Sequence, residues 1–183
     1  EKHSKKAISI DRKNDEFKKT LSLILLKKYD FKNAWLSFDG RLGLSEFSDK
    51  NPTLKLVQNK IPRKNVLDKN SKILVVREQG IGDEILYGTM YFDLLNKFSD
   101  LIIECDERLI PLFKNSFQSH ANKFVKLGTH SSNINKINNF DHIIYAGSLG
   151  KYFRNDLNSF LQNSYLKSMD NYEDLELENI LNK

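Results

Sequence analysis

The sequence lacks the features of membrane-spanning, secreted and disulfide-rich proteins, so we expect a soluble globular protein. It contains one cysteine, Cys105, which excludes an intrachain disulfide and fits a reducing cytoplasm. No apolar run approaches the roughly 20 residues that span a bilayer, and the longest covers only 21–26. A charged segment, 11–19, stands where a signal peptide would have its apolar core. We therefore expect a cytoplasmic protein without a transmembrane segment.

Signatures of metal and nucleic-acid sites are also missing. The four histidines are scattered, with no His-x-x-x-His spacing and no cysteine pair, so we expect no metal. Lysine and arginine give a net charge of +5, but they are mixed with Asn, Asp and Glu. This mixing is typical of a solvated surface, so we expect no nucleic-acid partner. The net positive charge is also compatible with binding of anionic ligands or membrane surfaces.

One stretch organises the chain, and it covers residues 72–88. Its apolar, β-branched residues 73–76 predict a strand that is covered on both faces. Gly80 and Gly82 then permit a sharp turn and the close approach of a ligand. Asp83 stands where a helix begins and can cap its free N–H groups. In parallel α/β folds, ligands bind beside the carboxyl ends of strands, where this turn would lie.

Strand and helix patterns alternate after this turn. Such alternation predicts a parallel sheet with right-handed crossovers, that is, an α/β fold with a Rossmann-like sheet and flanking helices. A second glycine-bearing turn, at Gly147 and Ser148, follows the fourth strand. The expected strands are 73–76, 101–105, 123–127 and 142–145, a polar loop covers 128–139, and the expected helices are 84–98, 107–117 and 156–166.

The segment before the sheet predicts a helical hairpin. Apolar residues at 3–4 spacing, with Asn14 or Asp15 as the cap, form a first helix, and Tyr29 and Asp30 interrupt it before a second helix begins at Phe31. Two helices within about 34 residues match the size of a tetratricopeptide repeat. The expected organisation is a polar lead-in 1–13, the hairpin 14–44, a linker 45–71 with extended pieces at 54–57 and 66–67, the Rossmann-like lobe 72–167, and a C-terminal helix 168–183.

Three chemistries compete for residues 78–83. A dinucleotide site needs a third glycine where Ile85 stands, and Asp83 would repel a pyrophosphate, although Glu104 occupies the place of a ribose-binding acid. A P-loop needs Lys-Ser/Thr after its second glycine, and the sequence has none. The third possibility is a carboxylate base at Asp83. Its structural alternative, that Asp83 only caps a helix, stays open.

Three segments together resemble one family. They are Arg-Glu-Gln-Gly-Ile-Gly-Asp-Glu-Ile at 77–85, Ile-Ile-Glu-Cys-Asp-Glu-Arg-Leu-Ile-Pro-Leu-Phe at 102–113 and Gly-Ser-Leu-Gly-Lys-Tyr-Phe-Arg at 147–154. With the preceding hairpin, they resemble bacterial tetratricopeptide-repeat proteins that carry a heptosyltransferase-like domain of the two-lobed GT-B glycosyltransferase architecture. This chain corresponds to the last repeat and the N-terminal lobe.

The resemblance implies a function in sugar transfer. The donor would be a nucleotide sugar bound as a substrate, with no other cofactor, and the acceptor would be a glycan or protein. Repeat helices would add a protein partner. The implied catalytic base is Asp83, and the implied substrate-binding residues are Glu78, Gln79, Gly80, Gly82, Gly147 and Ser148.

The chain departs from this architecture at its end. A donor-binding C-terminal lobe would need about 150 further residues, whereas the chain runs from Glu1 to Lys183. We therefore expect a fragment, a truncated gene or a stand-alone lobe, which becomes a hexosyl- or heptosyltransferase only when the second lobe completes it. The alternative is a non-catalytic, repeat-linked module that binds proteins or glycans.

Overall fold

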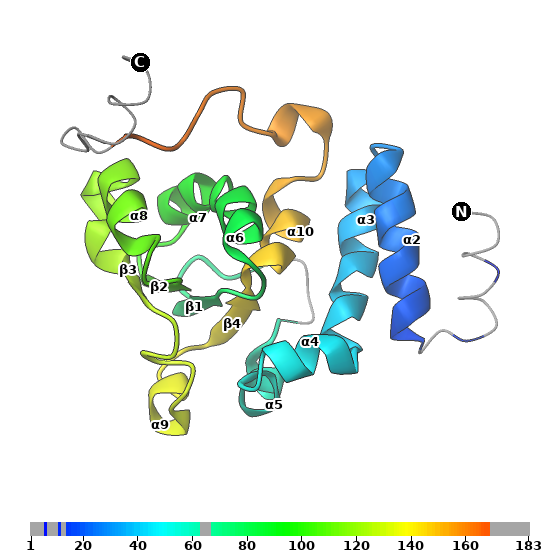
Figure 1. Ribbon diagram of the computed structural model, residues 1–183, viewed down its shortest axis with the longest axis horizontal. Helices are drawn as coiled ribbons and strands as arrows, with labels where there is room; N and C mark the ends of the chain where they lie inside the picture. The colour runs from blue at the N-terminus through cyan, green and yellow to red at the C-terminus, as the bar shows by residue number, and fades with distance from the viewer. Residues whose placement is uncertain (1–5, 7–10, 12–13, 63–66, 169–183) are drawn as a thin grey trace, which may run out of the picture.

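The computed structural model describes residues 6, 11, 14–62 and 67–168. In this part of the chain, a four-stranded parallel sheet has the order β3-β2-β1-β4, which confirms the predicted α/β, Rossmann-like fold class (Figure 1). Ile73 of β1 lies opposite both Leu101 of β2 and His142 of β4. The strands are β1 (Ile73–Val76), β2 (Leu101–Cys105), β3 (Phe124–Lys126) and β4 (His142–Tyr145).

The order in which the chain adds strands reverses at β1. The chain adds β2 and then β3 on one side of β1, and it crosses back to place β4 on the other side. In open α/β sheets, ligands bind in the crevice beyond the carboxyl ends of the strands at such a switch point. The crevice here is bordered by the turn 77–80 after β1 and by the short 3-10 helix η4 (Ala146–Leu149) after β4.

Helices cover both faces of the sheet (Figure 1). Because successive strand residues point to opposite faces, Ile73 and Val75 enter one hydrophobic core and Leu74 and Val76 enter the other. The first core is covered by α6 (Ile81–Gly88), α7 (Tyr91–Lys97) and α8 (Ile110–Ser116), and the second by α4 (Ser45–Lys50), α5 (Leu54–Val57) and α9 (Ile134–Ile137).

The N-terminal segment forms the predicted helical hairpin. Helix α2 (Asp15–Lys27) begins after Asn14, whose side chain accepts a hydrogen bond from the Phe17 amide at 3.1 Å. Helix α3 (Phe31–Phe38) packs against α2 around Leu25, which is fully buried. The membership of this hairpin in the tetratricopeptide repeats stays a prediction.

The hairpin packs on the sheet domain beside α10 (Gly150–Phe153), as Figure 1 shows. The Trp35 indole donates a hydrogen bond to the Arg154 carbonyl at 2.6 Å. Its ring also lies over Gly150, where an added Cβ would come within 2.5 Å of it. Phe31 packs on Phe160, with 4.7 Å between the ring centroids. The hairpin is therefore a packed part of this fold.

The expected linker 45–71 contains helices where it was expected to be loose. Residues 54–57, predicted as extended, form α5, and 45–50 form α4. Phe47 and Val57 are buried against the second face of the sheet, so burial of single apolar side chains stabilises helices that are too short to show a clear sequence period. The other expected extended piece, 66–67, lies partly outside the described residues.

Two expected helices differ from the prediction. The pattern 84–98 forms two helices, α6 and α7, that meet at Thr89 and Met90. The segment 156–166 was wrongly predicted as a helix. It contains only the 3-10 helix η5 (Leu157–Ser159), and two of its aromatic side chains make tertiary contacts: Phe160 packs on Phe31, and the Tyr165 hydroxyl donates to the Ile85 carbonyl.

Most other boundaries agree closely with the sequence. The loop 128–139 contains the single-turn helix α9, and α8 begins three residues later than predicted. The remaining short elements are the 3-10 helices η1 (Asp39–Gly43), η2 (Gln58–Lys60) and η3 (Gln118–Lys123). The lead-in 1–13 and the helix expected at 168–183 lie outside the described residues, apart from Lys6, Asp11 and Ser168. Among the described helices, none combines the length and apolar character needed to cross a membrane.

Candidate functional site at the carboxyl end of β1

A cavity of about 650 Å³ lies at the carboxyl end of β1. Its volume is within the usual range for small-molecule sites. One wall is the turn from β1 into α6, and the facing wall comes from the hairpin and α4. The lining residues are Lys19, Arg41, Leu44, Glu46, Phe47, Lys50, Asn51, Arg77, Glu78, Gln79, Gly80, Asp83 and Leu127.

Four of the residues predicted from the sequence line this cavity together. They are Glu78, Gln79, Gly80 and Asp83. The predicted Gly82 is exposed at the start of α6 and is not part of the lining.

The predicted Gly147 and Ser148 are buried in η4 and do not line the cavity. A Cβ at Gly147 would lie 2.3 Å from Oε1 of Glu78, so this glycine leaves room for the Glu78 carboxylate. The Ser148 hydroxyl accepts a hydrogen bond from Nη2 of Arg41 at 3.0 Å. In this structure, both residues pack against a cavity-lining ion pair from behind.

Asp83 lies in the first turn of α6 and does not cap it. The N-cap residue is Gly80, and no side-chain hydrogen bond closes that cap. The Asp83 carboxylate is partly buried and borders the cavity. Among the described residues, it has neither a hydrogen bond nor an ion pair, so its oxygens are available to a ligand. A negative charge at this end of a helix is also favourable, because the helix dipole is positive there.

Arg41 is the residue of the site that the sequence did not reveal. It lies in η1, where only 3% of its surface is exposed, and it forms a bidentate ion pair with Glu78. Nε donates to Oε1 at 3.0 Å and Nη2 donates to Oε2 at 2.6 Å. The residues are 37 positions apart, so no local spacing could have predicted the pair. Arg41 therefore occupies the switch-point crevice between β1 and β4.

Asp39 forms a second ion pair with Arg41, in which Oδ1 of Asp39 lies 3.2 Å from Nη1 of Arg41. Asp39 accepts hydrogen bonds from the Ser148 hydroxyl at 2.6 Å and from the Lys151 ammonium at 2.7 Å. Burial opposes ionisation of Asp39, but the charges of Lys151 and Arg41 outweigh it and the pKa of Asp39 is lowered. The Asp39 carboxyl is therefore ionised at neutral pH.

Arg77 forms a separate group on the other side of the turn. Its Nε lies 2.9 Å from Oε2 of Glu84, and its Nη1 lies 2.9 Å from Oδ2 of Asp106. Its Nη2 donates to the Gln79 carbonyl at 2.5 Å. Burial raises the pKa of Glu84, although Arg77 and the Asp106 amide act against this. Arg77 thus joins the turn to Glu84 and Asp106 by ion pairs and to the Gln79 carbonyl by a hydrogen bond.

Glu104 and Cys105 lie outside this chemistry. The Glu104 carboxylate is fully buried and accepts hydrogen bonds from Gly128, His130 and Ser131, so it cannot serve as a ribose-binding acid in this structure. Burial raises the pKa of the Cys105 thiol to about 12, which leaves it neutral and unreactive. Within the described ranges, no group of three or more His, Cys, Asp or Glu side chains is arranged to hold a metal ion.

The fold and cavity together define a class of protein. It is an α/β protein with a Rossmann-like parallel sheet and a cavity at the carboxyl end of its central strand. Comparison of the chain with protein-family models, with curated proteins and with solved structures finds no match.

Proposed function

We propose that this chain is the acceptor-side lobe of a glycosyltransferase-like protein, in which Asp83 accepts the proton of an acceptor hydroxyl. One observation carries the proposal. Of the three acids that line the cavity, Glu46 is paired with Lys50 and Glu78 with Arg41, whereas Asp83 has no such partner among the described residues. A general base needs a free lone pair within reach of its substrate.

The reaction would proceed at the mouth of the cavity. The acceptor oxygen would attack the anomeric carbon of a nucleotide sugar, its proton would pass to Asp83, and the nucleoside diphosphate would leave with the electron pair of the broken bond. The resemblance of residues 77–85, 102–113 and 147–154 to the heptosyltransferase-like family supports this chemistry. It also implies that a second lobe binds the donor.

A second candidate function is a non-catalytic module for glycans or proteins. The cavity supports it because one wall belongs to the hairpin and α4, with the exposed residues Glu46 and Lys50 at that side. A binding module would need this surface, and it would have no need for the free carboxylate of Asp83.

The test compares Asp83→Asn with Asp49→Asn, a control that removes an exposed carboxylate of α4 that does not line the cavity. Binding of nucleotide sugars, glycans and peptides is measured by titrating this chain. Transfer is measured with radiolabelled nucleotide sugars in the complete protein. We expect Asp83→Asn to bind acceptor glycans normally and to lose transfer by about 100-fold or more, while Asp49→Asn retains transfer. Unchanged transfer in a folded Asp83→Asn protein would refute the base, and binding of peptides alone would favour the module.

A further inference from the structure

Two walls of the cavity come from parts of the chain that the sequence separates. The turn that leads to Asp83 belongs to the sheet domain, and Arg41 belongs to the end of the hairpin. The Arg41 guanidinium and the Glu78 carboxylate meet where 4% and 0%, respectively, of their side-chain surfaces are exposed. Removal of water makes a bidentate pair of this kind sensitive to any change in the geometry of either partner.

Hydrogen bonds from two directions hold the turn 77–80 in place. On the side of the hairpin and α4, Arg41 holds the Glu78 side chain, and the Asn51 side-chain amide donates to the Glu78 carbonyl at 3.3 Å. On the sheet side, the Arg77 amide donates to the Glu104 carbonyl at 3.1 Å. Helix α6 begins three residues after Glu78, and Asp83 lies in its first turn. The direction in which Asp83 points therefore depends on where Glu78 is held.

Arg41 itself is held by groups that do not belong to the turn. Its Nη1 donates to the Phe38 carbonyl and to Oδ1 of Asp39, both at 3.2 Å. Asp39 is bound in turn by Ser148 and Lys151, which follow β4. The guanidinium thus joins the hairpin, the β4 edge and the turn after β1 in one buried cluster.

We propose that Arg41 is a positioning residue, through which the hairpin fixes the turn 77–80 and hence the Asp83 carboxylate. The link to catalysis rests on the proposed function of Asp83, while the link to the turn is independent of it. The hairpin then forms part of the site itself, in addition to any role in binding a protein partner. Without the two hydrogen bonds from the Arg41 guanidinium, the Glu78 side chain would be free to move, and the turn 77–80 could shift toward the cavity.

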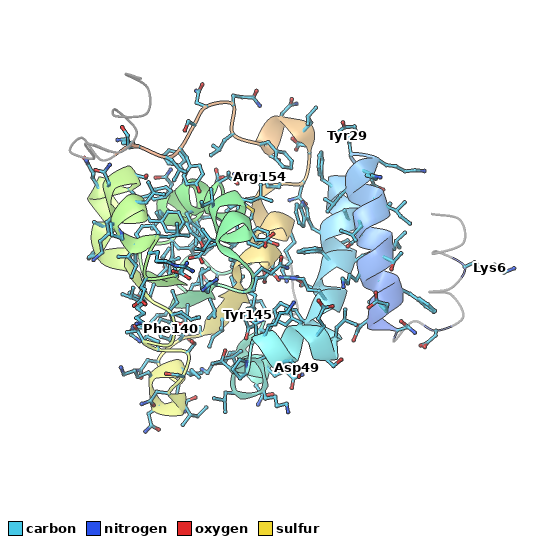
Figure 2. All side chains as sticks on the ribbon, in the orientation of Figure 1. Lys6, Tyr29, Asp49, Phe140, Tyr145 and Arg154 are labelled. Atoms are coloured by element: carbon cyan, nitrogen blue, oxygen red, sulfur yellow. The ribbon has the colours of Figure 1, made fainter. Side chains whose placement is uncertain are left out.

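A purely stabilising role for Arg41 is the competing explanation, and the chain offers a matched control. Arg154 is also buried, with 2% of its surface exposed. It joins α10 to α7 by donating to Asp93 at 2.7 Å and to the Thr89 carbonyl at 2.6 Å. Figure 2 labels Arg154 near α10, and it is not among the residues that line the cavity.

The experiment compares Arg41→Lys and Arg154→Lys by NMR. Lysine keeps the charge and loses the bidentate fork. Urea unfolding measures the stability of each variant. The amide shifts of 78–83 and the chemical shift of the Asp83 carboxyl carbon report on the turn without any ligand. Transfer in the complete protein, or acceptor affinity of this chain, reports on function.

For Arg41→Lys we expect changed amide shifts at 78–83, a changed chemical shift of the Asp83 carboxyl carbon and a loss of transfer of roughly 10–100-fold, since small displacements of a reacting group have effects of this size. For Arg154→Lys we expect lower stability with the turn unchanged. Unaltered shifts at 78–83 in folded Arg41→Lys would overturn the proposal. If Asp83→Asn retains full transfer while Arg41→Lys still perturbs the turn, the proposed base fails and the positioning contact stands.

Discussion

The Ser131 hydroxyl donates a hydrogen bond to Oε2 of Glu104 at 2.5 Å, and both side chains are fully buried. The same carboxylate accepts hydrogen bonds from the amides of Gly128, His130 and Ser131. A buried charge is stable in a protein when its lone pairs are satisfied in this way. Glu104 therefore fixes the loop that follows β3 to the end of β2.

Glu104→Ala would leave these amides without acceptors. Each buried polar group that loses its partner costs about 1–3 kcal/mol, so we expect the free energy of unfolding to fall by about 3 kcal/mol or more. Glu104→Gln keeps one acceptor oxygen and should lose less. Urea denaturation followed by circular dichroism measures both. The control is Glu107→Gln, which removes an exposed ion pair with Lys126 and should leave the midpoint nearly unchanged. A Glu104→Ala midpoint equal to that of the control would contradict this reading.

Gly147 and Gly82 should differ sharply in their tolerance of alanine. A Cβ at Gly147 would meet Glu78, Tyr87 and Arg41 at 2.3, 3.0 and 3.1 Å, whereas a Cβ at Gly82 would meet no atom within 4 Å. We expect Gly147→Ala to destabilise the protein by about 1–3 kcal/mol, as overpacking commonly does.

Gly82→Ala should leave stability unchanged or raise it by up to about 1 kcal/mol, because alanine favours the helix. Thermal unfolding compares the two variants. Equal melting temperatures would show that the β4 turn can move away from the ion pair. If Gly82→Ala also weakens acceptor binding while stability is kept, a ligand approaches the backbone at that position.

Asp39 predicts a particular acid sensitivity. Its pKa in the folded protein is lowered from the ordinary value of 3.8, because the charges of Lys151 and Arg41 outweigh the effect of burial. A lowered pKa contributes stability that is fully present above pH 3.8 and is lost as the pH falls through the folded value. Asp39→Asn should therefore be less stable at pH 7, and its stability should change less below pH 4.

The measurement is the free energy of unfolding from pH 2 to 7 for the parent chain and for the variant. The exposed Asp49 on α4, which Figure 2 labels, provides the control Asp49→Asn. Glu84 acts with the opposite sign, because its raised pKa makes its contribution fall as the pH rises. The difference between variants, and not the absolute curve, therefore reports on Asp39. Parallel curves for Asp39→Asn and the parent would refute the assignment.

The sequence predicts the sheet well because each strand contains a run of apolar residues. The bounds of β1, β2 and β4 agree with the predictions, and β3 is shorter by one residue at each end. Burial on both faces makes β1 apolar throughout, and β2 and β4 keep apolar runs beside Glu104 and His142. The fold class follows from their alternation with helices.

The segments that the sequence misassigned depend on distant contacts. Residues 156–166 have an apolar pattern, but Phe160 packs on Phe31 and the Tyr165 hydroxyl donates to the Ile85 carbonyl, so tertiary contacts override the local preference. The site shows the same division. Glu78, Gln79, Gly80 and Asp83 lie within six residues and were predicted together. Arg41 belongs to another segment, and its role becomes visible only when the hairpin packs on the sheet.

The position of Trp35 makes the junction between hairpin and sheet observable. It is the single tryptophan of the chain, and it lies partly buried between α3 and α10, with its indole bound to the Arg154 carbonyl. Its fluorescence is therefore a built-in probe of one interface, free of signal from any other indole. An emission shift to longer wavelength at a denaturant concentration that leaves the circular dichroism intact would reveal a hairpin that detaches first. Coincident transitions would show that hairpin and sheet unfold as one cooperative unit.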